Sequence, residues 1–342
     1  MNRVSASLAL SAVVVGLSAC ADSATKTVEP SLQQPVFTQY SEFNDSKHIM
    51  KLKDEGKKDA EDAQKVQDEA KRHGGGAGTG IYYHGGPVLR AATNVVAVYW
   101  SSSTIYNGGP TPGTAGTGAT DGSLVGYFLN HLGGSSYFNI NSTYTDGSGT
   151  PIANVVNYTH YWANNTNAPS GTQNVSDAEM IAMLQSGFTS GAITYDASTL
   201  YAIFTSGTVN LGGGFGTQYC AYHTHGTVNV GGSKTVLYAA MPYDYAYPGS
   251  CTNGTASPNG DPGADGEVNT LAHETEETTT DEMANAWFDL RGYENADKCA
   301  WTWGSTYSNG TGIANIKVGT KDFLVQQNWV NAGSGGCLKS YP

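Results

Sequence analysis

Residues 271–282 read LAHETEETTTDE, which places a His directly before a Glu and a second Glu three residues later. Zinc hydrolases often carry H-E-x-x-H on a helix, and here Glu277 stands in the position of the second His. Positions i and i+4 share one face of a helix, so His273 and Glu277 can grip one ion. The same letters also fit an acidic helix that happens to contain a His, and the choice between the two decides how the domain is interpreted.

The Glu beside the His has a different expected role. Glu274 points about 100° away from His273 around the helix axis, and in H-E-x-x-H enzymes this residue is the general base that activates water. We therefore expect Glu274 to be catalytic and not to bind the ion. Zinc accepts carboxylate oxygen as well as His nitrogen, so the third ligand can be Glu294 or Asp297, from a later segment that folds back.

The acidity of the chain is concentrated around this stretch. The 342 residues carry a net charge of −12, which argues against nucleic acid as a partner, because that partner needs a basic surface. Eleven Asp and Glu residues lie between positions 261 and 297. Such a local group of carboxylates is a candidate cation site, with a solvated acidic face as the alternative.

The N-terminus has the features of a bacterial lipoprotein signal. Arg3 precedes the apolar run SLALSAVVVG, and Leu17-Ser18-Ala19-Cys20 fits a lipobox, with cleavage before Cys20 and a lipid on its sulfur. The apolar run is too short to span a bilayer. An ordinary signal peptide followed by a chance Cys is the alternative. We expect residues 1–19 to be the signal peptide of an exported protein, anchored to a membrane of the bacterial cell envelope through Cys20.

A polar tether is expected over residues 20–80. It contains a charged segment at 47–73, which holds eight of the seventeen Lys and Arg residues and favours a solvated, weakly packed helix. Glycines at 74–78 then predict a flexible hinge. On this interpretation the globular domain covers residues 81–342 and begins near Ile81.

The globular region alternates between strand and helix patterns. A capping box of Ser176 and Glu179 begins one helix, and a hairpin is expected to turn near Gly319. These patterns predict one α/β (α+β) domain with a mixed sheet flanked by helices. Strands are expected at 94–100, 153–162, 199–206, 218–225 and 234–243, and further helices at 122–132 and 266–282.

Four cysteines follow Cys20, an even number that predicts two disulfides in an exported chain. Three pairings are possible. We favour Cys220–Cys251 and Cys299–Cys337, because each bond then closes a local loop.

Two other groups of residues are candidate sites. Asp261, Asp265 and Glu267 lie in a Gly-rich loop whose oxygen ligands suit Ca²⁺, although Asx turns before a helix explain them equally simply.

Three histidines are candidates for lining a cleft. His223 and His225 alternate on an expected strand and face the same side, so they could add a ligand or a proton donor to the site. His84 lies in YYHGGP, where the glycines let backbone approach closely. A pair of exposed histidines at a strand end and a hydrogen-bonded turn histidine are the alternatives.

Several short motifs follow one another over residues 81–340. They are YHGGPVL at 83–89, CAYH at 220–223, PNGD at 258–261, DG at 265–266, AHE at 272–274, NAW at 285–287, and Glu294, Asp297 and Cys299. In this order they resemble the EXORDIUM-like, or phosphate-induced protein 1, family. The resemblance implies an extracellular protein, since the family is best known from plants, where it is secreted to the cell wall and linked to growth. It implies no settled biochemical activity.

Together the motifs predict an envelope lipoprotein with a zincin-like helix, acting as a zinc-dependent peptidase or related hydrolase on an extracellular peptide. The alternative is a non-catalytic surface protein that binds a glycan or protein ligand and holds a structural metal. An open cleft above the helix favours the first function, and a helix buried on all sides favours the second.

The lipobox gives the first testable prediction. Cys20→Ser removes the sulfur that would carry the lipid, so this variant should lose acyl labelling and leave the membrane fraction. Metabolic labelling with a fatty acid analogue, followed by fractionation, checks both. Unchanged membrane association would contradict a lipid anchor.

Overall fold

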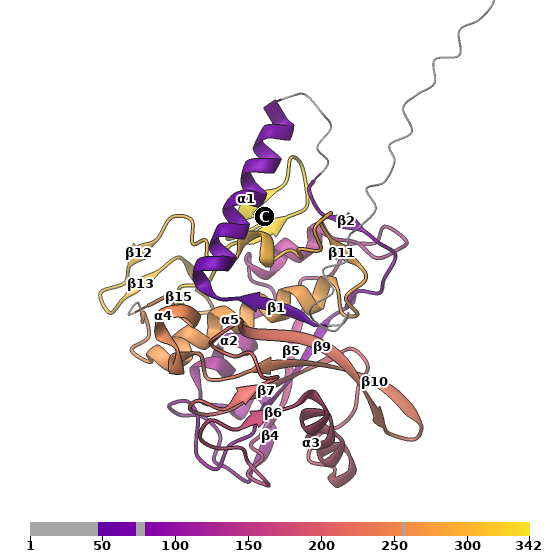
Figure 1. Cartoon of the computed structure of the whole chain (residues 1–342), viewed down its shortest axis with the longest axis vertical. Helices are drawn as coiled ribbons and strands as arrows, with labels where there is room; N and C mark the ends of the chain where they lie inside the picture. Colours follow the sequence, from indigo (N-terminus) through magenta and orange to yellow (C-terminus); the bar gives the residue numbers. More distant parts are fainter. Residues whose placement is uncertain (1–46, 73–78, 255–256) are drawn as a thin grey trace, which may run out of the picture. The chain divides into compact units, whose positions relative to one another are not determined.

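The computed structural model describes residues 47–72, 79–254 and 257–342. A seven-stranded sheet with the order β1-β9-β10-β7-β3-β5-β4 organises this part of the chain (Figure 1). Neighbouring strands are parallel from β10 through β7 and β3 to β5, while β9, β1 and β4 are antiparallel to their neighbours. The strands are β1 (His48–Lys51), β3 (Thr93–Tyr99), β4 (Ala115–Thr117), β5 (Val156–Trp162), β7 (Thr199–Phe204), β9 (Tyr219–Asn229) and β10 (Ser233–Met241).

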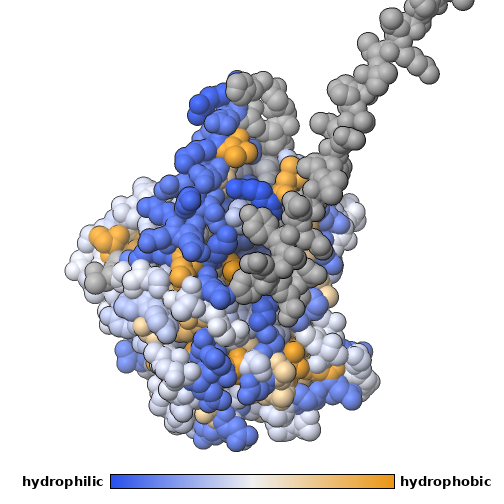
Figure 2. All heavy atoms as spheres, viewed as in Figure 1, coloured by the Kyte–Doolittle hydropathy of each residue, from blue (hydrophilic) through white to orange (hydrophobic). Residues whose placement is uncertain are grey.

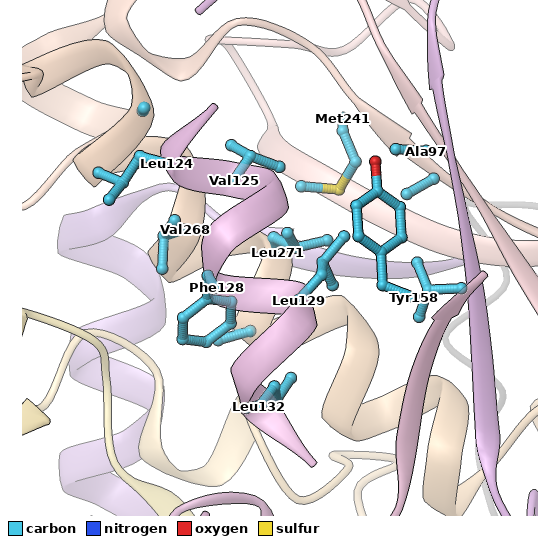
Figure 3. Packing of buried hydrophobic residues seen from close by; sticks show 14 of the residues in the cluster. Ala97, Leu124, Val125, Phe128, Leu129, Leu132, Tyr158, Met241, Val268 and Leu271 are labelled. Atoms are coloured by element: carbon cyan, nitrogen blue, oxygen red, sulfur yellow. The ribbon is translucent and has the colours of Figure 1, made fainter. Parts of the chain in front are cut away.

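Helices cover both faces of the sheet. Alternate residues of its central strands point to opposite faces, and two separate apolar clusters result. In the first, α2 (Leu124–Leu132) packs with α5 (Pro262–Thr280) against the sheet, and Figure 3 shows Phe128 and Leu129 of α2 near Val268 and Leu271 of α5. In the second, α3 (Asp177–Ser190) packs on the opposite face.

The predicted mixed α/β architecture is confirmed, with element ends shifted by a few residues. The capping box of Ser176 and Glu179 is present at the start of α3. The predicted hairpin forms between β14 (Ile316–Val318) and β15 (Lys321–Phe323), and Gly319 at its turn has a φ of 59°, a conformation that favours glycine.

Short elements complete the described chain. The remaining two-stranded sheets pair β2 (Tyr82–Tyr83) with β11 (Trp287–Phe288), β6 (Asn174–Val175) with β8 (Asn210–Leu211), β12 (Tyr307–Ser308) with β13 (Ile313–Ala314), and β16 (Asn328–Val330) with β17 (Gly336–Leu338). The helix α4 (Pro248–Cys251) and the 3₁₀ helices η1 (Gly118–Thr120), η2 (Phe138–Thr143), η3 (Asp244–Ala246) and η4 (Asp297–Cys299) lie between them.

Both predicted disulfides are confirmed. Cys220 of β9 is bonded to Cys251 of α4, and Cys299 of η4 is bonded to Cys337 of β17. Each bond closes a short loop of the chain, with sequence separations of 31 and 38 residues.

The expected start of the globular domain near Ile81 is wrong. Residues 48–51 form β1, a strand of the central sheet, and α1 (Lys53–Arg72) then packs beside η4. Met50, Ala60 and Ala63 are buried. The sequence pattern was misleading because most of α1 faces solvent, and Figure 2 shows a largely hydrophilic surface over this helix.

The residues described contain no helix long and apolar enough to cross a membrane. Cys20 and the expected signal peptide lie outside the described residues.

The packing between α2 and its neighbours gives a stability prediction. Phe128 is fully buried and meets Phe323 edge to face at 5.2 Å. Phe128→Ala should therefore lower the free energy of unfolding by about 3–5 kcal/mol. Leu290→Ala is the control, because Leu290 is 53% exposed. Urea unfolding measures both variants, and equal losses would show that the α2 packing is not a main support of the fold.

Candidate metal centre

The helix α5 carries its polar side chains into the interior. Asp261 begins the helix by accepting a hydrogen bond from the Ala264 N–H, and Pro262 occupies the first turn, where a missing N–H costs nothing. Every residue from Gly263 to Thr280 is buried. Buried polar groups need partners, so the segments packed around α5 have to supply them.

Seven side chains from four segments meet on one side of α5, and we call them the ligand cluster. Three overlapping groups within it each bring three ligand-type atoms to within 4.8 Å of one another. The members are His48 of β1, His223 of β9, His273, Glu274 and Glu277 of α5, Glu294, and Asp297 of η4.

The first group is close to the predicted one. The Nε2 atom of His273 lies 3.1 Å from Oε1 of Glu277 and 3.6 Å from Oδ1 of Asp297. Glu277 Oε1 also accepts a hydrogen bond of 2.9 Å from the Asp297 N–H. This bond holds η4 against α5, and the disulfide at Cys299 fixes η4 from its other end.

The strand β9 supplies the imidazole at the centre of the cluster. Nδ1 of His223 lies 3.2 Å from Oε2 of Glu274 in a hydrogen bond and 3.6 Å from Oε2 of Glu277. Its Nε2 atom faces the other way, 3.7 Å from Oε2 of Glu294. His223 therefore separates the carboxylates of α5 from Glu294.

His48 was missed by the sequence reasoning, which placed it in a solvated helix. In the structure His48 pairs opposite His223 in the β1–β9 ladder, and the two rings lie 5.4 Å apart. Nδ1 of His48 directly contacts Oε2 of Glu294. The neighbouring Ile49 and Met50 were the one available signal for a strand, since β-branched and apolar residues favour a half-buried sheet position.

Many atoms of the cluster lack hydrogen-bond partners. They include both ring nitrogens of His273, Nε2 of His223, one carboxylate oxygen each of Glu274 and Glu277, and both of Glu294. Although His273 and Glu277 are 3.1 Å apart, their orientation is not that of a hydrogen bond. Nitrogen and oxygen atoms that face one another at short distance without forming a hydrogen bond are the arrangement expected around a bound cation.

Burial and neighbouring charges shift the pKa values of these groups, in opposite directions for His273. Burial by itself lowers the pKa of His273, but the charge of Glu277 and the contact with it, together with the charges of Glu274 and Asp297, raise that pKa to about 10. Burial, with the charge of Glu277, raises the pKa of Asp297 to about 8. Burial and the neighbouring His48 lower the pKa of His223 to about 3, so its imidazole is neutral and able to act as a ligand.

The spacing of the donors fits a small divalent ion. Zinc bonds to nitrogen and oxygen are about 2.0–2.1 Å long, so the ligand atoms of a tetrahedral site lie about 3.3 Å apart. The two distances from His273 Nε2 in the first group, 3.1 and 3.6 Å, lie on either side of this value. Nitrogen mixed with carboxylate oxygen is a donor set that zinc accepts.

The carboxylates proposed for calcium have other partners. Asp265 accepts hydrogen bonds from Ser257 and Asn259, and Asp261 caps α5. Glu267 turns inward, where Oε2 accepts a bond from the Asp244 N–H. In the described ranges, no group of three ligand-type side chains contains any of the three predicted residues, so this arrangement favours the alternative of capping and Asx turns.

The two remaining candidate histidines lie away from the cluster. His84 is exposed and stacks on Phe288, with ring centroids 3.6 Å apart, and its Nε2 lies 3.2 Å from the Phe288 carbonyl oxygen. This is the turn histidine of the alternative. His225 lies two residues beyond His223 on β9 and belongs to none of the ligand-type groups in the part of the chain described.

Comparison with known proteins gives one match. The family model described as the phosphate-induced protein 1 conserved region matches residues 131–321. This range includes His223, all of α5, and the segment with Glu294 and Asp297, whereas His48 precedes it. No curated protein and no solved structure matches the chain.

A second pair of buried carboxylates on α5 gives a prediction for pH. Burial raises the pKa of Glu267 to about 8, and burial with the Glu267 charge holds the pKa of Asp244 well above its usual range. Because the folded pKa of Glu267 exceeds its unfolded value of 4.5, its contribution to stability is present below about pH 4.5 and is lost as the pH rises to about 8.

Glu267→Gln should therefore lose less stability between pH 5 and pH 8 than the unmodified protein does. Urea unfolding at both pH values measures the difference, with the exposed Glu69→Gln as control. Parallel losses in Glu267→Gln and the unmodified protein would show that Glu267 does not hold a proton in the folded state.

Proposed function

The chain belongs to the phosphate-induced protein 1 family, and from the ligand cluster of its domain we propose that it is a zinc-dependent hydrolase acting on peptides. On this proposal it is exported and works at the bacterial cell envelope, attached through a lipid at Cys20. The observation that carries the proposal is the set of buried His and carboxylate atoms that converge around α5 without hydrogen-bond partners.

Each group of the chain has a distinct role in this proposal. His273, Glu277 and Asp297 hold the ion, and the N–H of Asp297 orients the carboxylate of Glu277. When bound, Zn²⁺ supplies a Lewis acid that polarises a carbonyl group. Glu274 accepts the proton of the attacking water at Oε1, which has no hydrogen-bond partner, while His223 holds Oε2. The Glu274 carboxylate is thereby fixed beside the ion site and keeps one oxygen for proton transfer.

The second candidate is a non-catalytic binding protein with a structural metal, and the burial of α5 on all sides is the arrangement expected for it. Two further observations favour it. The cluster meets solvent only at His48 and Asp297, whose side chains are 18% and 16% exposed. An open pocket of about 540 Å³ lies elsewhere, lined by residues that include Tyr127, His131 and Lys321. An aromatic ring beside several polar side chains is a surface suited to a sugar.

Metal content tests the ion site directly. The full-length protein, saturated with Zn²⁺ and freed of excess ion by gel filtration, should contain Zn²⁺ by elemental mass spectrometry. His273→Ala and Glu277→Ala should each contain at least one ion less per chain, because a three-ligand site loses a third of its donors. His225→Ala is the matched control and should match the unmodified protein. Equal Zn²⁺ content in His273→Ala would rule out an ion at this position.

Glu274→Gln separates the hydrolase from the binding protein. It should keep its Zn²⁺ and lose about 10²–10⁴-fold in the rate of cleavage of a labelled unfolded polypeptide, because general-base catalysis contributes that much. A protein that binds Zn²⁺ but cleaves no polypeptide, with or without this substitution, would favour the binding function. Loss of sugar binding in Tyr127→Ala would then support it.

A further inference from the structure

The ligand cluster contains two groups that share no residue. One is His273, Glu277 and Asp297, already assigned to the ion of the proposed function. The other consists of His48, His223 and Glu294. Seven donors exceed the four that a zinc ion takes, so a single ion leaves the second group without a role.

Burial gives a further argument for a second ion. The cluster has four carboxylates, Glu274, Glu277, Glu294 and Asp297, and three histidines. Glu274, Glu277 and Glu294 are fully buried, and burying unpaired charge is costly.

The atoms of the second group are positioned as ligands. Nδ1 of His223 is hydrogen-bonded to the carboxylate of Glu274. Because an ionised carboxylate only accepts, Nδ1 is then the donor, and the lone pair of Nε2 is directed at Glu294, without a hydrogen-bond partner. A ligand His often donates its other N–H to a carboxylate in this way. Neither oxygen of Glu294 accepts a hydrogen bond, although the side chain is fully buried. Nδ1 of His48 closes the group from β1.

We propose that His48, His223 and Glu294 form a second divalent-cation subsite, which makes the cluster a two-ion centre. This inference rests on the proposed function for its first ion. The sequence left Glu294 and Asp297 as alternative third ligands of a single ion. The proposal assigns Asp297 to the first ion and Glu294 to the second. Glu274 lies between the two subsites. It is hydrogen-bonded to His223 of the second subsite, and it directly follows His273 of the first subsite along α5.

The second subsite also fastens the N-terminal strand to the domain. β1 has its own attachments, since Lys47 pairs with Asp177 at 2.5 Å and the Trp301 indole donates to the Lys51 carbonyl at 2.9 Å. An ion on His48 joins β1 to β9 and to the Glu294 segment at once. Ion binding at this subsite therefore stabilises the docking of residues 47–72.

Zn²⁺ stoichiometry tests the second subsite without an activity assay. The full-length protein should hold two Zn²⁺ per chain after saturation and gel filtration. His48→Ala and Glu294→Gln should each hold one Zn²⁺ per chain, because they lose the ion of the second subsite. Asp297→Asn should also hold one, because it loses the ion of the first subsite. His84→Ala should hold two. Lys47→Ala loosens β1 without removing a ligand and should also hold two, which separates ligation from a general effect on β1.

The possible failures are distinguishable. One ion in the unmodified protein, lost in His273→Ala and kept in His48→Ala, overturns the second subsite and leaves the proposed function standing. Two ions in His48→Ala, or one ion in Lys47→Ala, overturn the ligand role of His48. An unmodified protein without Zn²⁺ overturns both proposals. Circular dichroism of each variant confirms that it is folded before its metal is counted.

Discussion

The burial of a polar helix is the constraint on which the rest of this structure depends. α5 is surrounded on all sides, yet it carries His, Glu and Thr side chains around its whole circumference. The polar side chains on each side of the helix therefore need hydrogen-bond partners from a different segment. Glu276 accepts a hydrogen bond from Asn328, Thr279 bonds to Thr93 of β3, and Glu267 accepts one from the Asp244 backbone. Other polar atoms on α5, such as Oε1 of Glu267 and Oγ1 of Thr275, also stay without hydrogen-bond partners. On the side of the ligand cluster, however, the unpartnered atoms belong to close groups of His and carboxylate side chains.

The segments that meet α5 there are held by covalent and backbone constraints near each functional residue. Cys220 lies three residues before His223 on β9 and is bonded to α4. Cys299 lies two residues after Asp297 and is bonded to β17. These bonds restrict the movement of the donors before any ion is bound. A site whose donors are already in place loses less conformational entropy when it binds its ligand.

The closed surroundings of the cluster bear on the choice between catalysis and structure. Low exposure strengthens every electrostatic interaction inside the site, which suits a Lewis acid and equally suits an ion with a structural role. The two exposed points, His48 and Asp297, belong to the two different groups of donors. Each group of donors therefore has one partly exposed member, and in the second group this member lies on β1, the strand paired with β9.

The sequence by itself determined the family, the mixed α/β class and the helix with the H-E-x-x-E spacing, and it favoured the disulfide pairing that the structure has. These features depend on short motifs in a consistent order, on local periodicity and capping residues, and on cysteines close enough in the chain to close local loops. It also predicted that His273 and Glu277 would meet a carboxylate from the segment after residue 287, because i and i+4 positions share a helical face.

Only the tertiary structure decided which distant residues complete the cluster. His223 enters because sheet alternation turns it towards α5, and His48 enters because the β1–β9 register places it opposite His223. Neither register nor strand order can be deduced from a charged N-terminal segment, which has the pattern of a solvated helix. For the same reason the sequence did not separate Glu294 from Asp297. Three residues apart in the chain, they face different histidines because the chain turns at Asn295 and Ala296, just before η4, and because β1 brings His48 to Glu294.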